Sequence, residues 1–352
     1  MKTKKPEVLP GTIRIKASNL MAYKKTERSW KKVSKIFPEA MIIIKLFKKN
    51  KRFHFLVDKK NPDFLKGQLA PNGMAQGARI GILPNGKKLN KSFSLLAPDL
   101  MIHDESTKCH WDVIYKNPGG THSYLYTMEK VKKFRREKYH VVKEFERYHP
   151  KIMVRVYNAL RNKNDHMALP MFTLLKTYMR VGNEIYYKLR RHKGLTTMKK
   201  SDIDIKGKRV SFRYIGKGGV PTSITAVFPK VYIDRLRDLL RNIGKSSFVF
   251  ENRNTGRPIN EEHFKKAFKR YCGKEFYPHI VRSFYATRRV KKFLAGPAPI
   301  TKKNVYSLFY SIAEMLGHKR FIKKDGTWRE NYAVTINHYV QPEILERIRM
   351  AV

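Results

Sequence analysis

The chain has 352 residues, and its 76 Lys and Arg residues against 28 Asp and Glu residues give a formal net charge of +48. Its hydrophobic fraction of 41% and aromatic fraction of 12% can supply an ordinary core, so a disordered basic tail is excluded. The length allows two domains. A folded body with this much self-repulsion needs a polyanionic partner, and nucleic acid is the first candidate.

Several other classes of protein fit the composition poorly. The chain has no long apolar run, and its basic residues are spread over its whole length, so we expect no membrane partner. No apolar segment follows the basic start, Met1 to Pro6, and a secretory signal is not expected. The only cysteines, Cys109 and Cys272, exclude a disulfide framework and suit a reducing, intracellular location. The histidines lack metal-ligand spacing and no GxxxxGK[ST] loop is present, so we expect no metal and no cofactor.

The first domain, predicted over residues 1–134, is β-rich and rich in loops. Clusters of Pro, Gly and Asn separate three strand-like runs, at 11–15, 41–47 and 53–57. A dense basic stretch at 130–138 is predicted to be the junction between domains.

The second domain, predicted over residues 139–352, is mainly helical. Apolar spacing predicts helices over 169–189 and 229–243, and a third helix is predicted from the Asn260 cap to Gly273. Between the first two helices, alternating residues around 210–214, a Gly-rich turn at 216–219 and a second run at 222–228 predict a β-hairpin insertion. The predicted fold class is therefore α+β, with a β-rich N-terminal domain and a helical domain that carries a hairpin.

Five side chains in the helical half could together cleave and rejoin a phosphodiester: Arg180, Lys217, Arg282, His318 and Tyr339. When a tyrosine attacks phosphorus, negative charge gathers on two non-bridging oxygens, which two arginines can clamp and a histidine can contact as a further donor. A lysine on a hairpin tip can protonate the departing 5′ oxygen. A cationic pocket favours the phenolate of a tyrosine, whose free pKa is about 10. Such a reaction needs neither metal nor ATP.

Each of these residues also has an ordinary structural explanation. In so basic a chain, Arg180 and Arg282 can be simple phosphate contacts or solvated charges, and Lys217 a charge at a hairpin tip. His318 follows a glycine and can be a helix-capping residue, and Tyr339 is one of 19 tyrosines. Only the sequence around them separates the two interpretations.

That surrounding sequence resembles type IB DNA topoisomerases, especially the compact poxvirus and bacterial forms. The resemblance covers about 165–350 and lies in six motifs: Arg180-Val-Gly-Asn-Glu184, Gly194-Leu-Thr-Thr197, Val210-Ser-Phe-Arg-Tyr-Ile-Gly-Lys217, Arg282-Ser-Phe-Tyr-Ala-Thr287, Leu316-Gly-His318 and Tyr339-Val-Gln-Pro-Glu343. Upstream, Gly120-Thr-His-Ser-Tyr-Leu-Tyr126 is similar to the stretch that ends the family's N-terminal domain and touches DNA. Residues before about 110 show no match.

The resemblance implies a role for each of the five residues. Arg180 and Arg282 would clamp the scissile phosphate, and Lys217 would be the general acid. His318 would be a hydrogen-bond donor in the transition state, and Tyr339 would be the nucleophile that forms a 3′-phosphotyrosyl link.

The resemblance also implies DNA contacts and an architecture. Tyr124, Tyr126 and Tyr186 would contact DNA, and His279, which is lysine in the poxvirus-like enzymes, would assist at the phosphate or pack beside it. The family has the tyrosine recombinase/topoisomerase IB catalytic fold in a C-shaped clamp around double-stranded DNA. A monomer that takes no small-molecule substrate would then relax supercoiled DNA in a nucleus or, for a viral protein, in a viral DNA-replication compartment or virion.

Three alternatives stay open. The gap between His318 and Tyr339 is longer than in the compact enzymes, with an insertion at 323–329, so Tyr332 is a rival nucleophile seven residues before Tyr339. The run His279-Ile-Val-Arg282 is also compatible with a site-specific tyrosine recombinase or integrase. A DNA-binding architectural protein without catalysis is a third hypothesis.

Overall fold

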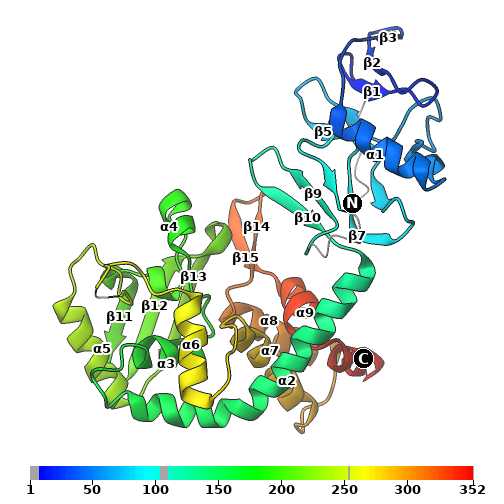
Figure 1. The fold of residues 1–352 in the computed structure, drawn as a ribbon. Helices are drawn as coiled ribbons and strands as arrows, with labels where there is room; N and C mark the ends of the chain where they lie inside the picture. The colour runs from blue at the N-terminus through cyan, green and yellow to red at the C-terminus, as the bar shows by residue number, and fades with distance from the viewer. Residues whose placement is uncertain (1–7, 104–109, 253, 352) are drawn as a thin grey trace. The chain divides into compact units, whose positions relative to one another are not determined.

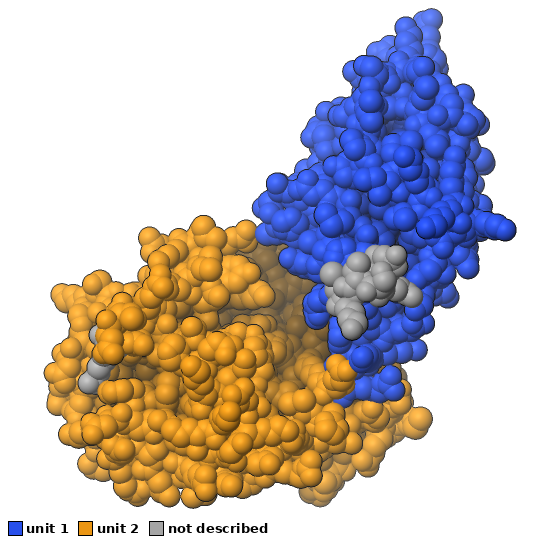
Figure 2. All heavy atoms as spheres, viewed as in Figure 1, with its two compact units in different colours: residues 1–136 blue, residues 137–352 orange. Residues whose placement is uncertain are grey.

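The structure is a computed structural model that describes residues 8–103, 110–252 and 254–351. The basic start, Met1 to Pro6, and Cys109 lie outside the described residues, while Cys272 is a buried free thiol. The chain divides into two compact units, Met1–Arg136 and Glu137–Val352, which Figure 2 shows in separate colours. The boundary between them falls inside helix α2 (Met128–Ala159), which also contains the basic stretch at 130–138.

The regular structure of the first unit consists mainly of short antiparallel strands joined by loops (Figure 1). Its sheets have the orders β3-β2-β1-β4-β5, β6-β7 and β10-β9-β8. The strands are β1 (Ile13–Ile15), β2 (Ala22–Lys25), β3 (Trp30–Lys32), β4 (Gln68–Leu69), β5 (Ala75–Gln76), β6 (Ile80–Ile82), β7 (Lys88–Phe93), β8 (Met101–Ile102), β9 (Val113–Lys116) and β10 (His122–Leu125).

The predicted strand at 41–47 is wrong, because this run lies in helix α1 (Pro38–Lys49). Ile43, Ile44 and Phe47 are buried at helical spacing, whereas Ile42 is exposed. A proline at the first turn and lysines in the last turn suit the two ends of a helix. The strand predicted at 53–57 is also wrong, since Phe53–Leu56 form a turn of 3₁₀ helix.

The second unit is mainly helical and contains a three-stranded sheet, β11-β12-β13, and a two-stranded one, β14-β15 (Figure 1). The α+β class predicted from the sequence is thus confirmed. No helix among the described residues is long and apolar enough to cross a membrane. After α2 the elements are α3 (Ala168–Thr177), α4 (Glu184–Arg190), 3₁₀ turns at Leu195–Thr197 and Lys200–Asp202, β11 (Ile203–Lys206), β12 (Arg209–Ile215), a 3₁₀ turn at Lys217–Gly219, β13 (Pro221–Val227), α5 (Lys230–Asn242), α6 (Glu261–Cys272), α7 (Ile280–Leu294), α8 (Lys302–Met315), β14 (Lys319–Ile322), β15 (Thr327–Glu330), α9 (Tyr332–Tyr339) and α10 (Pro342–Ala351).

The predicted hairpin and two of the predicted helices are confirmed. β12 pairs with β13 from Arg209 to Ile215, and α5 buries one apolar face. The Asn260 side chain accepts from two amides at the start of α6, and Gly273 ends that helix with a φ of 89°.

The long helix predicted over 169–189 is wrong, because it is two helices with an extended link between them. Tyr178 ends α3 in the left-handed region with a φ of 55°, and the Asn183 side chain begins α4 by accepting from the amides of Ile185 and Tyr186. The link between the helices carries Arg180, so the break determines where this side chain lies.

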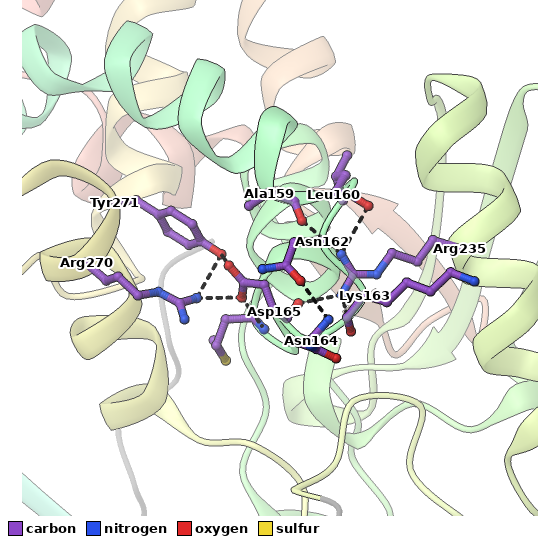
Figure 3. A network of polar contacts seen from close by, with 10 residues as sticks. Ala159, Leu160, Asn162, Lys163, Asn164, Asp165, Arg235, Arg270 and Tyr271 are labelled. Atoms are coloured by element: carbon purple, nitrogen blue, oxygen red, sulfur yellow. Dashed lines mark hydrogen bonds and ion pairs between the residues drawn. The ribbon is translucent and has the colours of Figure 1, made fainter.

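A polar network anchors the turn between α2 and α3 (Figure 3). The Asp165 carboxylate accepts from Arg270 at 2.6 Å and from the Tyr271 hydroxyl at 2.7 Å, both on α6. Arg235 of α5 donates to four backbone carbonyls in this turn, those of Ala159, Leu160, Lys163 and Asp165. The amides of Asn162 and Ala168 also donate to the Ala159 and Asp165 carbonyls, so the arginine adds to the backbone hydrogen bonds of this turn and links it to α5.

Candidate active site

The segment that carries Arg180 is held by the Gly194 motif. The amide of Leu195 donates to the Arg180 carbonyl at 2.8 Å. The amide of Thr196 donates to the Val181 carbonyl at 2.7 Å. A Cβ at Gly194 would lie 2.7 Å from the Arg180 carbonyl oxygen, so only glycine allows this approach. The two motifs, separated in sequence, thus form one structural unit that positions the Arg180 side chain.

Arg282 lies on α7 and is only 2% exposed. Its Nη1 donates to the Tyr178 carbonyl at 2.7 Å, and its Nη2 donates to the Leu316 carbonyl at 2.7 Å. Burial, followed by the charge of Arg180, lowers the pKa of the Arg282 guanidinium, while Tyr339 opposes this effect. The guanidinium is therefore a fixed, largely desolvated cation.

His318 follows the end of α8, where Gly317 has a φ of 62° that lets the chain turn into β14. The imidazole is 5% exposed. Its Nε2 lies 3.1 Å from Nη2 of Arg282, and its Nδ1 lies 2.9 Å from Oγ1 of Thr335. Burial, and then the charges of Arg282 and Arg180, lower the pKa of His318 to about 2. The ring is consequently neutral at physiological pH.

Tyr339 ends α9 with its side chain inside this cationic site. The residue is 4% exposed, and its hydroxyl accepts a hydrogen bond from Nη2 of Arg180 at 3.0 Å. The guanidinium of Arg282 lies 5.3 Å from the centre of its ring, and the His318 ring lies 4.6 Å away. The structure thus brings four of the five predicted residues into direct contact.

The fifth, Lys217, lies at the tip of the β12–β13 hairpin and is exposed. A cavity of about 180 Å³ is lined by Lys217 together with Arg180, Arg282 and His318. One small cavity is therefore lined by four of the predicted groups, and one of these, Arg180, also contacts Tyr339.

The insertion at 323–329 belongs to a separate hairpin, β14–β15, between His318 and α9 (Figure 1). The ends of this hairpin meet, because the amide of Asn331 donates to the His318 carbonyl at 2.5 Å. Helix α9 therefore begins beside His318 whatever the length of the hairpin. This closure explains how a long sequence gap leaves Tyr339 next to the histidine.

Tyr332 and Tyr339 both lie on α9, but only Tyr339 lies in the site. Tyr332 is the first residue of the helix, 38% exposed, and its ring packs on that of Tyr306. Seven residues return to nearly the same face of a helix, yet they separate two side chains by roughly 10 Å along its axis. Axial position, which the sequence periodicity left open, distinguishes the two tyrosines.

His279 and Tyr186 line a second cavity, of about 280 Å³, which also includes Arg180 and Lys217. The His279 ring lies 5.5 Å from that of Tyr339. Burial, and then Arg282, lower the pKa of His279 to about 3, so this ring is neutral as well. Tyr186 lies on α4 with 55% of its surface exposed.

Tyr124 and Tyr126 belong to the first unit. Tyr124 lies on β10 and is 46% exposed. Tyr126 contacts the rings of His110 and Phe134, and burial raises its pKa. Tyr124 is thus a surface side chain, while Tyr126 belongs to an aromatic cluster.

Sequence reasoning missed two residues that contact the site. The ammonium of Lys138 lies 5.2 Å from the centre of the Tyr339 ring, and it donates to the backbone carbonyl of His338. Thr335 is fully buried and contacts His318. For Thr335 a signal existed, because it lies four residues before Tyr339 and so on the same face of the helix. Lys138 lies inside a basic run, and nothing in the sequence distinguishes it from the lysines around it.

The electrostatics of the site suit an anion. Three cations lie close to the Tyr339 side chain, Arg180 at its hydroxyl and Arg282 and Lys138 near its ring, and both histidines are neutral. Within the described part of the chain, no group of three or more His, Cys, Asp or Glu side chains could hold a metal ion. The cations themselves can supply the charge that a phosphoryl transfer requires.

The buried neutral histidines predict that acid destabilises the fold. In the unfolded chain a histidine has a pKa of about 6.5, whereas the folded values are about 3 for His279 and about 2 for His318. Below pH 6.5 the unfolded chain binds protons that the folded chain does not, so the free energy of unfolding decreases from that pH toward pH 3. We expect the melting temperature to fall over this range, and to fall less in the double variant His279→Asn, His318→Gln. An identical decline in both proteins would contradict this explanation.

Comparisons with known proteins agree with the geometry. A family model described as the catalytic core of eukaryotic DNA topoisomerase I matches residues 129–341. A protein named DNA topoisomerase 1B, from Acanthamoeba polyphaga mimivirus, is 25% identical over 223 residues. That match covers 58% of this chain and 66% of the viral protein.

Solved structures of recombinases are more distantly similar. XerA recombinase is 17% identical with a TM-score of 0.36, over 57% of this chain and 62% of the recombinase. XerH recombinase, in a post-cleavage complex with a palindromic difH substrate, is 16% identical with a TM-score of 0.37, over 57% and 49% of the two chains.

Proposed function

Because this chain belongs to the family of the eukaryotic DNA topoisomerase I catalytic core, we propose that it is a type IB DNA topoisomerase. It relaxes supercoiled duplex DNA by cutting one strand, letting the helix rotate, and resealing the cut. Neither ATP nor a metal takes part, since the energy of the broken bond is kept in the protein–DNA link.

In this proposal the reaction is a transesterification. The Tyr339 hydroxyl gives up its proton to solvent, and its oxygen attacks the scissile phosphorus, so that a bond forms between them while the bond from phosphorus to the 5′ oxygen breaks. Lys217 gives a proton to the departing 5′ oxygen. Arg180 and Arg282 bind the non-bridging oxygens, and His318 donates a further hydrogen bond. The product is a 3′-phosphotyrosyl link, and religation is the reverse reaction.

The observation that carries the proposal is the Arg180–Tyr339 contact. The tyrosine hydroxyl accepts from a guanidinium at 3.0 Å, in a buried site that Arg282 and His318 share. An attacking oxygen beside a fixed cation lies where phosphate charge would collect. If Arg180 and Arg282 served only to bind DNA phosphates, there would be no need for a buried tyrosine beside them.

DNA binding follows from the charge of the chain. A net charge of +48 favours contacts with the phosphate backbone that tolerate many sequences, and affinity should fall steeply with added salt. We assign the two domains, residues 1–134 and 139–352, to a clamp around duplex DNA formed by a monomer. Tyr124, Tyr126, Tyr186 and His279 are its further DNA contacts. We assign the protein to the nucleus or, if it is viral, to a viral DNA-replication compartment or the virion.

A site-specific tyrosine recombinase is the second candidate. The observation that favours it is His279, a histidine within 5.5 Å of the Tyr339 ring, which in sequence precedes Arg282 as in recombinases. Such an enzyme would need paired DNA sites and would form junctions between them.

One experiment separates these functions. We expect the purified protein to relax a negatively supercoiled plasmid with no specific site, in EDTA and without ATP, and we expect Tyr339→Phe not to do so. Products should appear as a ladder of topoisomers on an agarose gel. Failure to relax the plasmid, together with junction formation on paired sites, would favour the recombinase. No covalent protein–DNA adduct from the unmodified protein would favour an architectural role.

A further inference from the structure

Both ring nitrogens of His318 have a partner in the structure. Nε2 lies 3.1 Å from Nη2 of Arg282, and Nδ1 lies 2.9 Å from Oγ1 of Thr335. All three side chains are at least 95% buried, so water does not substitute for these partners.

Chemistry determines which nitrogen carries the proton. An arginine can only donate, so Nε2 must accept from Arg282 and cannot itself be protonated. The ring is neutral, and its one proton is therefore on Nδ1. Nδ1 then donates to the hydroxyl oxygen of Thr335. In the protein without DNA, Nε2 of His318 is therefore a hydrogen-bond acceptor, and it faces Arg282.

The proposed reaction needs the opposite arrangement. A phosphate oxygen is an acceptor, so His318 can assist it only with a hydrogen on Nε2. In a neutral ring Nδ1 must then lose its proton and become an acceptor. A buried acceptor without a donor is costly, at about 1–3 kcal/mol, so the second tautomer needs a donor beside Nδ1.

We propose that Thr335 is a positioning residue that lets His318 exchange one tautomer for the other when DNA binds. A hydroxyl both accepts and donates. Thr335 accepts from Nδ1 in the free protein, and by rotating its hydroxyl it donates to Nδ1 in the DNA complex. Nδ1 loses its proton to solvent and Nε2 takes one from solvent through the cavity that His318 lines, so the ring stays neutral. This inference rests on the proposed function, because it concerns the same phosphate.

The exchange also affects Arg282. Both hydrogens of its Nη2 are used, one by the Leu316 carbonyl and one by His318. Its Nε is buried and has no hydrogen-bond partner in the described structure. A phosphate pairs side-on with the Nε and Nη2 hydrogens of an arginine, so it can do this here only if one Nη2 hydrogen is released. Once Nε2 of His318 is protonated it no longer accepts, and that hydrogen becomes available.

Helix α9 carries both Thr335 and Tyr339. Thr335 lies four residues before Tyr339, so one rigid turn of helix carries both the nucleophile and the partner of His318. The closed ends of the β14–β15 hairpin hold that helix beside His318. The tautomer partner and the attacking tyrosine are thereby positioned by the same element.

Nitrogen NMR of ¹⁵N-histidine-labelled protein tests the exchange directly. The Tyr339→Phe variant is measured free and bound to a short duplex that it cannot cleave, and a His318→Gln variant identifies the signal. We expect a protonated Nδ1 in the free protein and a protonated Nε2 in the complex. The same tautomer in both states would overturn the proposal.

Single-turnover cleavage by otherwise unmodified protein supplies the second measurement. Thr335→Val keeps the shape but removes the hydroxyl, and we expect it to slow adduct formation by about 10- to 100-fold without weakening DNA binding. Thr335→Ser should recover most of the rate. Thr173→Val is the matched control, since Thr173 is also fully buried and makes two hydrogen bonds, to Leu169 and Tyr232.

The outcomes separate the two proposals. Rapid cleavage by Thr335→Val, with an unmodified enzyme that forms the adduct, would overturn only the role of Thr335. Equal slowing by Thr173→Val would also overturn it, because loss of stability would then be the cause. No adduct from the unmodified enzyme would instead overturn the proposed function.

Discussion

Tyr339→Phe is expected to abolish covalent capture of DNA, with a loss on the order of 10⁴-fold or more. The substitution removes the attacking oxygen and leaves the ring, which packs between Arg282 and His318. DNA binding should change little, because it depends on charge spread over the whole chain. Adducts trapped with denaturant and resolved on a gel measure the first quantity, and a filter-binding titration measures the second.

The matched control is Tyr332→Phe. It makes the same chemical change on the same helix, at a position that is 38% exposed and packs on Tyr306. We expect Tyr332→Phe to capture DNA as the unmodified protein does. If it abolishes capture while Tyr339→Phe retains it, the nucleophile is Tyr332.

Lys217→Ala is expected to slow cleavage by about 10²- to 10⁴-fold, the usual contribution of a general acid. Lys217 lines the small cavity with Arg180, Arg282 and His318, so its ammonium can reach an oxygen that leaves a phosphate bound there. A substrate with sulfur in place of the 5′ oxygen should recover much of the rate. A thiolate departs without a proton, and the acid is then unnecessary.

Lys206→Ala is the control for Lys217→Ala. Lys206 ends β11 in the same sheet, and its side chain is 82% exposed, so the substitution removes one charge without touching the cavity. Cleavage by this variant should match that of the unmodified protein. Equal slowing by both variants, or no recovery with the 5′-thio substrate, would show that Lys217 acts only through its charge.

Where local sequence determines structure, the predictions from sequence are confirmed. Helices α5 and α6 have an apolar face at helical spacing, and an asparagine cap and a terminal glycine bound α6. The β12–β13 hairpin has alternating residues and a Gly-rich turn. In each case the signal lies within a few residues of the structure that it specifies.

The predictions of secondary structure were wrong where contacts with residues distant in sequence determine the local structure. The run at 41–47 is rich in β-branched residues, but its buried face is helical because α1 packs on the core of the first unit. The predicted helix at 169–189 is interrupted where the backbone carbonyl of Arg180 accepts a hydrogen bond from the amide of Leu195, fifteen residues away. Apolar periodicity carries no information about such a partner.

For the site, the sequence by itself determined the fold class and which five side chains belong together, because their motifs resemble those of one family. The Pro and Glu that follow Tyr339 also favoured it over Tyr332, whereas only the tertiary structure shows that Tyr339 alone of the two contacts Arg180, since periodicity gives the face of a helix but not the distance along it. The tertiary structure alone also showed that His318 is neutral and accepts from Arg282, with Thr335 on its other nitrogen. A tautomer depends on burial and on three side chains from α7, α9 and the end of α8, and the chain brings these together only when it folds.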